Sequence, residues 1–333
     1  GSTFKMISAM AFLKSGIDPK LIYNDYNGYY QVGNWKWRAW KRGGHGPTDM
    51  KKSLVESANT YYYKFSDQIG YAPIVKVARD FSLGQKSGID VPGEKTGIIP
   101  DPDWKKKKTK TVWFRGDTIL LSIGQGFTLV TPIQLAKAYT FLANKGWAYD
   151  PHVVSRIEDV QTGKIETVVT QKTVLTDYPA SFYETINDAL IATVDQNNGT
   201  TKIMKNPYVK VAAKSGSAQN PHSKLTHAWA AGYFPADTEP EIVFVCLLEG
   251  AGGGGVMAGG MAKRFLDKYL EVEKGIEVVK KTPQTETKQV NTSTTQRNVN
   301  NNNSEQGRGE ETVNEERETE TTSTTSTSEG EEN

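Results

Sequence analysis

The sequence predicts an α/β fold of the α+β type, in which helices pack against an antiparallel sheet. Three strand-like segments, at residues 209–217, 227–234 and 241–248, follow one another through short links, which favours antiparallel pairing. Helical patterns dominate the chain before them, and an amphipathic pattern over residues 258–269 closes the domain. With 37% hydrophobic residues and seven Trp in 333 residues, the chain can bury a large core.

Charge is distributed unevenly along the chain. The net charge is +2, but residues 282–333 hold eleven acidic and four basic side chains, a balance of −7 that leaves +9 on residues 1–281. The end of the chain is dominated by Thr, Ser, Asn, Gln and Glu, and such a segment buries too little apolar surface to offset its ordering entropy. We therefore expect a domain over residues 1–280 and a disordered acidic tail over residues 281–333.

Cysteine content and hydropathy exclude several classes of protein. Cys246 is the single cysteine, which excludes an internal disulfide framework and a cysteine-based zinc cluster. No apolar run reaches the roughly 18 residues of a membrane span, and no signal peptide is recognisable. Because the sequence opens without Met and inside a motif, we interpret it as a fragment whose export signal or anchor would lie upstream.

The first expected element is an apolar helix that opens with a serine and a lysine. Residues 4–13 are apolar nearly all round, as in a buried helix, and Gly16 offers a stop. Ser2 and Lys5 stand at i and i+3, on one helix face. A lysine can accept the proton of a serine once burial or positive charge lowers its pKa, so the two are a candidate nucleophile and base. Ser-x-x-Lys also occurs by chance, and Gly-Ser can remain from a cleaved tag.

Residues 17–46 interleave aromatic and basic side chains. This composition can bind nucleic acid, but the segment is short and matches no nucleic-acid motif, so a surface flap or hairpin is favoured. His45 lies among glycines with no clustered Cys or carboxylate beside it, which favours a loop histidine over a metal ligand.

A second helix is expected to begin at Thr48 as N-cap, and its pattern breaks at residues 57–59 before resuming from Tyr61 to Gly70. Ser and Asn compete with the backbone for hydrogen bonds and favour such breaks. The Ser-x-Asn at the break either caps the interhelix turn or directs a hydroxyl and an amide into a cleft.

Glycine and proline predict a loop over residues 87–108, in which the lysine run at its end forms a solvated face or meets an anionic membrane surface. The clearest helix signature has Thr131 as N-cap, Pro132 in the first position and Gly146 at the end. The glycines before it match neither a P-loop nor a dinucleotide fingerprint.

Two further elements are expected before the sheet. Residues 153–169 alternate as a hairpin would around the turn at 161–164. Ser181 and Glu184 form a capping-box pattern for a helix that reaches about Val194.

Three short motifs combine into a set. Ser-x-x-Lys at 2–5, Ser-x-Asn at 57–59 and Lys-Ser-Gly at 214–216, on helix, interhelix turn and strand in that order, resemble the active-site motifs of penicillin-binding proteins and serine β-lactamases. Longer stretches, such as residues 113–118 and 249–255, look like the penicillin-binding protein 2 group, the class B D,D-transpeptidases of rod-shape elongation. The resemblance covers residues 1 to roughly 275.

This resemblance implies acyl transfer between peptidoglycan stem peptides. A serine would attack the penultimate D-alanine carbonyl of a donor stem, D-alanine would leave, and an amine of a second stem would take the acyl group. The implied catalytic residues are Ser2, Lys5, Ser57 and Lys214. The implied substrate-binding residues are Asn59, Ser215, Gly216 and Ser217. The oxyanion hole would consist of the backbone N–H groups of Ser2 and Ser217.

The implied roles follow from the side chains. Lys5 would be the base toward Ser2, and Ser57 would pass the proton to the leaving amine. Lys214 would help keep Lys5 deprotonated and attract the terminal carboxylate of the substrate. Asn59 would hold the substrate amide. The carboxylate would be bound by the hydroxyls of Ser215 and Ser217.

The sequence departs from the family in three respects. The usual Lys-Thr-Gly-Thr is Lys-Ser-Gly-Ser here, which keeps the hydroxyls. Some relatives carry a zinc site with a histidine near His45, but Ala39 and Ala58 occupy positions of two of its ligands, so we predict no metal and no cofactor. The family also has helix and strand elements ahead of the serine, so the resemblance implies a β-lactamase/transpeptidase-like sheet that lacks its first strands.

The resemblance also implies a location and partners. The catalytic domain would lie on the periplasmic side of the cytoplasmic membrane. Its partners would be stem peptides, β-lactams, a membrane glycosyltransferase and elongation-complex proteins, and not nucleic acid. Two alternatives stay open: a β-lactamase or D,D-carboxypeptidase, in which water replaces the acceptor amine, and a non-catalytic β-lactam sensor or scaffold.

Overall fold

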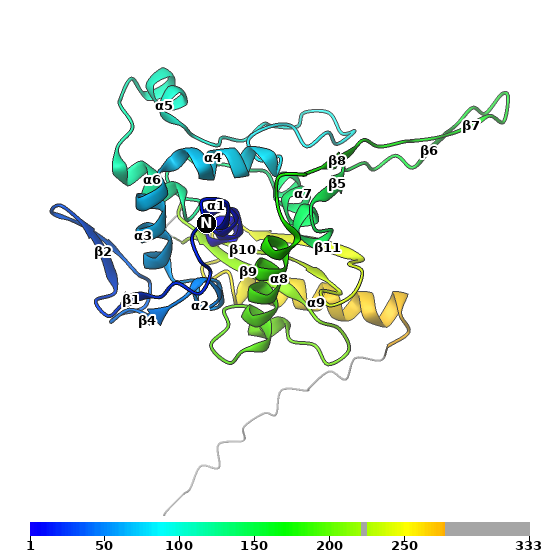
Figure 1. The fold of residues 1–333 in the computed structure, drawn as a ribbon. Helices are drawn as coiled ribbons and strands as arrows, with labels where there is room; N and C mark the ends of the chain where they lie inside the picture. Colours follow the sequence, from blue (N-terminus) through cyan, green and yellow to red (C-terminus); the bar gives the residue numbers. More distant parts are fainter. Residues whose placement is uncertain (221–224, 277–333) are drawn as a thin grey trace, which may run out of the picture. The chain divides into compact units, whose positions relative to one another are not determined.

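The computed structural model describes residues 1–220 and 225–276, which belong to one compact unit. The predicted tail over residues 281–333 lies outside the described residues. Figure 1 shows helices gathered around a central sheet, with a narrow arm of paired strands extending from the body. No helix in the described ranges combines the length and the apolar composition needed to cross a bilayer.

The central sheet is antiparallel, as the sequence predicts. Its strands are β9 (Ala212–Ala218), β10 (His227–Phe234) and β11 (Ile242–Leu248), in the spatial order β11-β10-β9. The predicted bounds of β10 are confirmed, whereas β9 begins at Ala212, three residues later than predicted. Side chains of β10 alternate between two clusters: Ala230 packs with one and Ala231 with the other. The sheet is therefore buried on both faces.

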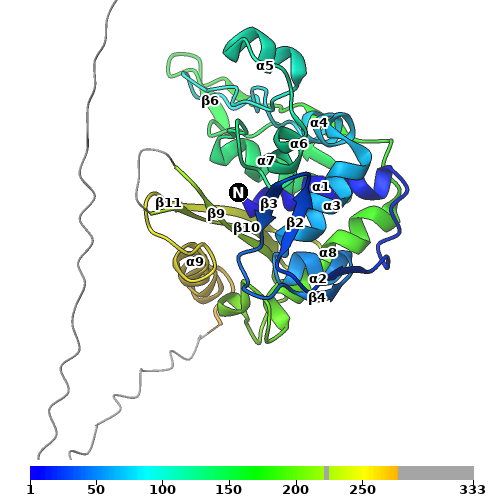
Figure 2. The ribbon, with the colours of Figure 1, turned by 90° about the vertical axis from the view of Figure 1, so that its left-hand side faces the viewer.

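One face of the sheet is covered by α9 (Met257–Glu273), as Figure 2 shows. Its inward side chains recur at the four-residue spacing of an amphipathic helix, and the stripe consists of Ala258, Ala262, Leu266 and Leu270. The predicted closing helix is confirmed, with four more residues at its C-terminal end.

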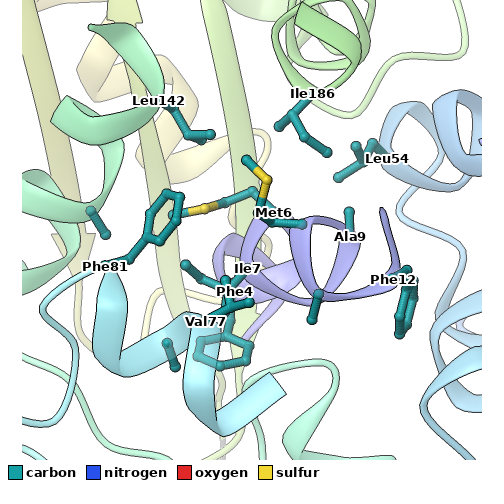
Figure 3. Close-up of a cluster of buried hydrophobic side chains, with 14 of the residues drawn as sticks. Phe4, Met6, Ile7, Ala9, Phe12, Leu54, Val77, Phe81, Leu142 and Ile186 are labelled. Atoms are coloured by element: carbon teal, nitrogen blue, oxygen red, sulfur yellow. The ribbon is translucent and has the colours of Figure 1, made fainter. Parts of the chain in front are cut away.

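The other face carries a helical body built around α1 (Lys5–Lys14), which follows a 3₁₀ turn, η1 (Ser2–Phe4). Every residue of α1 except its last is buried, which accounts for a sequence that is apolar nearly all round. The helices in contact with α1 include α3 (Asn59–Ile69), α4 (Tyr71–Asp80) and α8 (Ala180–Asp195), and α7 (Pro132–Ala143) contributes Leu142 to the same cluster. Figure 3 shows Met6 and Ile7 of α1 among side chains from these neighbours. The candidate nucleophile Ser2, in η1, thus directly precedes a helix that is almost wholly buried.

Shorter elements complete the described part of the chain. The remaining helices are α2 (Met50–Val55), α5 (Pro102–Thr109), α6 (Arg115–Leu121) and the 3₁₀ turn η2 (Lys202–Met204). The remaining strand pairs are β1 (Tyr23–Asp25) with β4 (Gly46–Thr48), β2 (Tyr29–Val32) with β3 (Trp35–Arg38), β5 (Trp147–Tyr149) with β8 (Lys172–Val174), and β6 (Arg156–Glu158) with β7 (Ile165–Thr167). The predicted hairpins within residues 17–46 and 153–169 are confirmed.

Two predicted helix caps are wrong. Asp49, not Thr48, caps α2: its carboxylate accepts a hydrogen bond from the Lys52 amide at 2.7 Å. Both residue types are good N-caps, and Thr48 is instead taken up by pairing in β4. Ser181 does not open a capping box, because α8 already begins at Ala180. At α7 the predicted start is confirmed by a complete capping box at Thr131, although the helix ends three residues before Gly146.

The predicted loop over residues 87–108 is also wrong at its end. Residues 102–109 form α5, with Asp101 as N-cap accepting from the Trp104 amide at 2.7 Å. The lysine run on this helix is not uniformly solvated, because Lys105 is buried and forms a 2.5 Å ion pair with Asp117. A strong N-cap followed by proline was the overlooked helix signal.

Candidate active site

The structure brings the three motifs to one place. Ser2 lies in η1, Ser57 and Asn59 lie at the junction of α2 and α3, and the third motif lies on β9, an edge strand of the sheet. They line a cavity of about 660 Å³. The predicted site residues on its wall are Ser2, Ser57, Asn59, Ser215, Gly216 and Ser217. The two predicted lysines, Lys5 and Lys214, are fully buried.

Lys5 is held by the second motif. Its Nζ lies 2.8 Å from the Ser57 carbonyl oxygen, 3.1 Å from Ser57 Oγ and 2.6 Å from Asn59 Oδ1. Lys5 Nζ is the donor in each of these three contacts, so all of the hydrogen bonds that the described residues give this amine go to the second motif.

The surroundings of Lys5 oppose its charged form. Burial, followed by the positive charge of Lys214, holds the pKa of Lys5 well below its usual value. Burial also lowers the pKa of Lys214 to about 7. The ring of Tyr62, whose centroid lies 5.1 Å from Lys5 Nζ, adds to the apolar wall. The lowered pKa is in the direction that the predicted role of Lys5 as a base requires.

The spacing of Ser2 and Lys5 does not by itself produce a hydrogen bond between them. No hydrogen bond in the described part of the chain joins the Ser2 hydroxyl to Lys5 Nζ, which Ser57 and Asn59 occupy instead. The i, i+3 spacing sets both residues at the start of one helix, but the partners of the amine come from another element.

The third motif packs closely on η1 and on the glycine-rich segment after β11. A side chain at Gly216 would place its Cβ 3.1–3.2 Å from the backbone nitrogens of Ser2 and Thr3, so a glycine lets the strand approach the nucleophile. Ser217 Oγ accepts a hydrogen bond from the Gly254 amide at 3.1 Å. A Cβ on Gly254 would lie 2.0 Å from the Gly216 carbonyl oxygen. The glycine-rich segment after β11 is thus fitted against the site.

Several residues at the site were not singled out by the sequence. Thr200, in the loop after α8, places its Oγ1 3.5 Å from Lys214 Nζ. Trp40 donates from Nε1 to the carbonyl oxygens of Glu56 and Ser57, at 3.2 Å each. Neither residue belongs to a motif. The place of Trp40 in an aromatic and basic segment is the only feature of the sequence that could have pointed to it.

His45 occupies a loop, as predicted, but it is buried and has a carboxylate partner. Its Nδ1 lies 2.7 Å from Glu56 Oε2. Asp25, also buried, accepts from the His45 amide and from Thr60 Oγ1. Across residues 1–220 and 225–276, no three His, Cys, Asp or Glu side chains are grouped as they would be to hold a metal ion.

Comparison with known proteins assigns the family. Residues 1–271 match the model of the penicillin binding protein transpeptidase domain. The chain belongs to the penicillin-binding protein transpeptidase family. Its α+β fold is that of this family, as the sequence predicts.

Named transpeptidases are among its relatives. The peptidoglycan D,D-transpeptidase MrdA of Haemophilus influenzae is 34% identical over 250 residues, which cover 71% of this chain and 38% of that protein. MrdA of Acinetobacter baumannii is 31% identical over 290 residues, 82% of this chain and 42% of that protein. The chain therefore spans well under half the length of these curated relatives.

Solved structures agree in fold. The crystal structure of Pseudomonas aeruginosa PBP2 in complex with WCK 5153 matches with a TM-score of 0.72 and 31% identity, covering 83% of this chain and 59% of that one. The complex between PBP2 and MreC from Helicobacter pylori matches with a TM-score of 0.71 and 27% identity, covering 82% and 49%.

Proposed function

We propose that this protein is a serine-type peptidoglycan D,D-transpeptidase of the penicillin-binding protein 2 group, which cross-links stem peptides in cell-wall elongation and is acylated by β-lactams. The observation that carries the proposal is the buried Lys5, whose pKa is lowered, held by Ser57 and Asn59 beside a cavity that Ser2 lines. The matches to MrdA proteins support the reaction class.

The first half of the reaction forms the acyl-enzyme. Ser2 Oγ attacks the carbonyl carbon of the penultimate D-alanine, and its proton passes to Lys5 Nζ, which acts as the base in its neutral form. The developing oxyanion is stabilised by the backbone N–H groups of Ser2 and Ser217, each typically worth about 10²- to 10³-fold in rate. The C–N bond then breaks, and Ser57 Oγ relays the proton from Lys5 to the departing amine of D-alanine.

The second half runs these steps in reverse with a different amine. The amino group of a second stem attacks the acyl-enzyme carbonyl, its proton returns through Ser57 to Lys5, and Ser2 is released. Lys214, which carries charge in part of the molecules at pH 7, attracts the terminal carboxylate of the donor. Ser215 and Ser217 line the same cavity, and their hydroxyls would bind this carboxylate.

Partners and location follow from the reaction. The substrates are stem peptides on lipid-linked or nascent glycan strands, which lie outside the cytoplasmic membrane, so the catalytic domain works on the periplasmic side. A membrane glycosyltransferase that supplies new strands and elongation proteins are the expected partners; the Helicobacter pylori PBP2 structure is a complex with MreC.

Intact-mass analysis with a fluorescent penicillin tests the proposal. We expect one adduct on the wild-type full chain and none on Ser2→Ala. Equal labelling of both would refute the assignment of the nucleophile. Rapid loss of the adduct would instead indicate a hydrolytic enzyme, and a stable adduct without transfer of a stem-peptide analogue to an amine would indicate a sensor or scaffold.

A further inference from the structure

The turn that holds Lys5 has an unfavourable backbone conformation. Ser57 has a φ of +54°, in the left-handed region that residues other than glycine rarely adopt. Such a conformation costs of order 1–3 kcal/mol and persists when surrounding contacts enforce it. All three partners of Lys5 Nζ come from Ser57 and Asn59, so the base depends on whatever enforces the turn.

The carboxylate of Glu56, the residue before this turn, is hydrogen-bonded by two side chains. His45 Nδ1 lies 2.7 Å from Glu56 Oε2, and Asn198 Nδ2 donates to Oε1 at 2.9 Å. Trp40 donates to the carbonyl oxygens of Glu56 and Ser57, the second of which also accepts from Lys5. We call His45, Glu56 and Asn198 the Glu56 clasp.

The protonation of the clasp follows from its surroundings. Burial lowers the pKa of His45 and outweighs the nearby Glu56, so the imidazole is neutral at pH 7. Its Nε2 is buried and makes no hydrogen bond, which places the one ring proton on Nδ1, where it is donated to Glu56. Burial opposes ionisation of Glu56, but hydrogen bonds from His45 and Asn198 and the charges of Lys41 and Lys52 lower its pKa overall.

The clasp connects segments far apart in the sequence. His45 directly precedes β4, Glu56 follows α2, and Asn198 follows α8; Figure 1 shows β4 beside α2. The loop of Asn198 also carries Thr200, whose amide donates to the Val55 carbonyl and whose hydroxyl meets Lys214. The Glu56 carboxylate therefore links the segments that contact Lys5 and Lys214.

We propose that Glu56 is a positioning residue for the acyl-transfer reaction: held by His45 and Asn198, it fixes the Ser57–Asn59 turn around Lys5. The inference rests on the proposed function, because it assigns Lys5 as the base. Glu56 touches neither Lys5 nor, in the proposed reaction, the substrate; it acts through the turn.

The test measures acylation of the full chain by a fluorescent penicillin, resolving the apparent dissociation constant from the first-order acylation rate constant. Glu56→Gln keeps the side-chain volume and an acceptor for Asn198. Its amide N–H faces His45 Nδ1, so the ring proton would have to move to the partnerless Nε2. Glu56→Ala removes the clasp entirely. Glu166→Ala, on the exposed arm, is the matched loss of a carboxylate.

We expect both Glu56 variants to lower the first-order rate constant about 10- to 100-fold, the effect of a small misplacement of a catalytic group, with the dissociation constant within about threefold. The acidic limb of the pH profile should move to higher pH, because a loosened turn admits water and raises the pKa of Lys5. The double variant His45→Gln, Glu56→Gln should lower the acylation rate constant no more than the more strongly affected of its two single variants does. Glu166→Ala should match the wild type.

Two results would overturn the inference. One is wild-type rate constants in both Glu56 variants. The other is a smaller fraction of labelled protein at saturation, with the labelled molecules reacting at the wild-type rate constant and with the wild-type pH profile. That result would mean that Glu56 acts in folding alone. If the wild type is not acylated at Ser2, both the proposed function and this inference are wrong. If the wild type is acylated and the Glu56 variants react at the same rate, only the positioning role of Glu56 is wrong.

Discussion

At the scale of single residues, the position of the Lys5 amine explains why the Ser2–Lys5 pair needs side chains from another part of the fold. Ser57 and Asn59 accept all three hydrogen bonds that Lys5 Nζ donates. Burial and the charge of Lys214 then lower the pKa of the amine. Each of these conditions comes from a different element of the fold, and the first helix alone supplies none of them.

Replacement of Lys5 by methionine tests this view. Lys5→Met keeps the shape of the side chain but removes the base, so acylation by a β-lactam should fall by about 10²- to 10⁴-fold. The carbonyl of Ser57 keeps its hydrogen bond from Trp40, whereas Asn59 Oδ1 loses its 2.6 Å partner, so unfolding should be about 1–3 kcal/mol easier. Rates and denaturant unfolding of the full chain check both parts; acylation at the wild-type rate would contradict the role of Lys5.

At the scale of elements, local signals predicted what local physics decides. Thr131 and Pro132 predicted the start of α7 because capping is a matter of neighbouring residues. The choice between Thr48 and Asp49 was decided by the pairing of β4 with β1, which the local sequence does not reveal. Helices α4 and α6 were not predicted.

The candidate site shows the same difference between local signals and long-range contacts. The motif residues meet at one cavity as the resemblance implied, since the order and context of the motifs are visible in the sequence. The partners that hold them were not predictable: Asn198 reaches Glu56 across 142 positions of sequence, and only the packing of α8 against α2 brings them together. Long-range packing is what the sequence patterns do not encode.

The glycine-rich segment after β11 offers a matched pair of substitutions. Gly254→Ala would place a methyl group 2.0 Å from the Gly216 carbonyl oxygen, so the segment must shift and the Gly254 amide must leave Ser217 Oγ. We expect a loss of about 1–3 kcal/mol in unfolding free energy and slower acylation. At Gly253 nothing lies within 4 Å of an added Cβ, so Gly253→Ala should change neither quantity appreciably. Equal effects of the two would show that the segment does not fit against β9.

At the scale of the whole molecule, the domain stabilises its sheet on both faces and uses the buried space beside it for two lysines. Lys5 and Lys214 are fully buried within a domain whose other buried side chains are mostly apolar. A buried amine is unfavourable when charged. The charge state of the site and the stability of the fold are therefore linked through pH.

The sign of this linkage follows from the depressed pKa of Lys214, about 7 in the folded protein against 10.5 for the free side chain. Below pH 7 both states are protonated, and the folded state carries the unfavourable buried charge. Between about pH 7 and 10.5 the unfolded chain binds more protons than the folded one, so stability rises with pH.

Comparison with Lys214→Met isolates this contribution, because the other titrating groups are common to both proteins. The unfolding free energy of the wild type should increase more from pH 7 to pH 9 than that of the variant, since methionine removes both the titration of Lys214 and its effect on Lys5. Denaturant unfolding of the two full chains at both pH values measures the difference. An equal or larger increase in the variant would mean that Lys214 keeps an ordinary pKa in the folded protein.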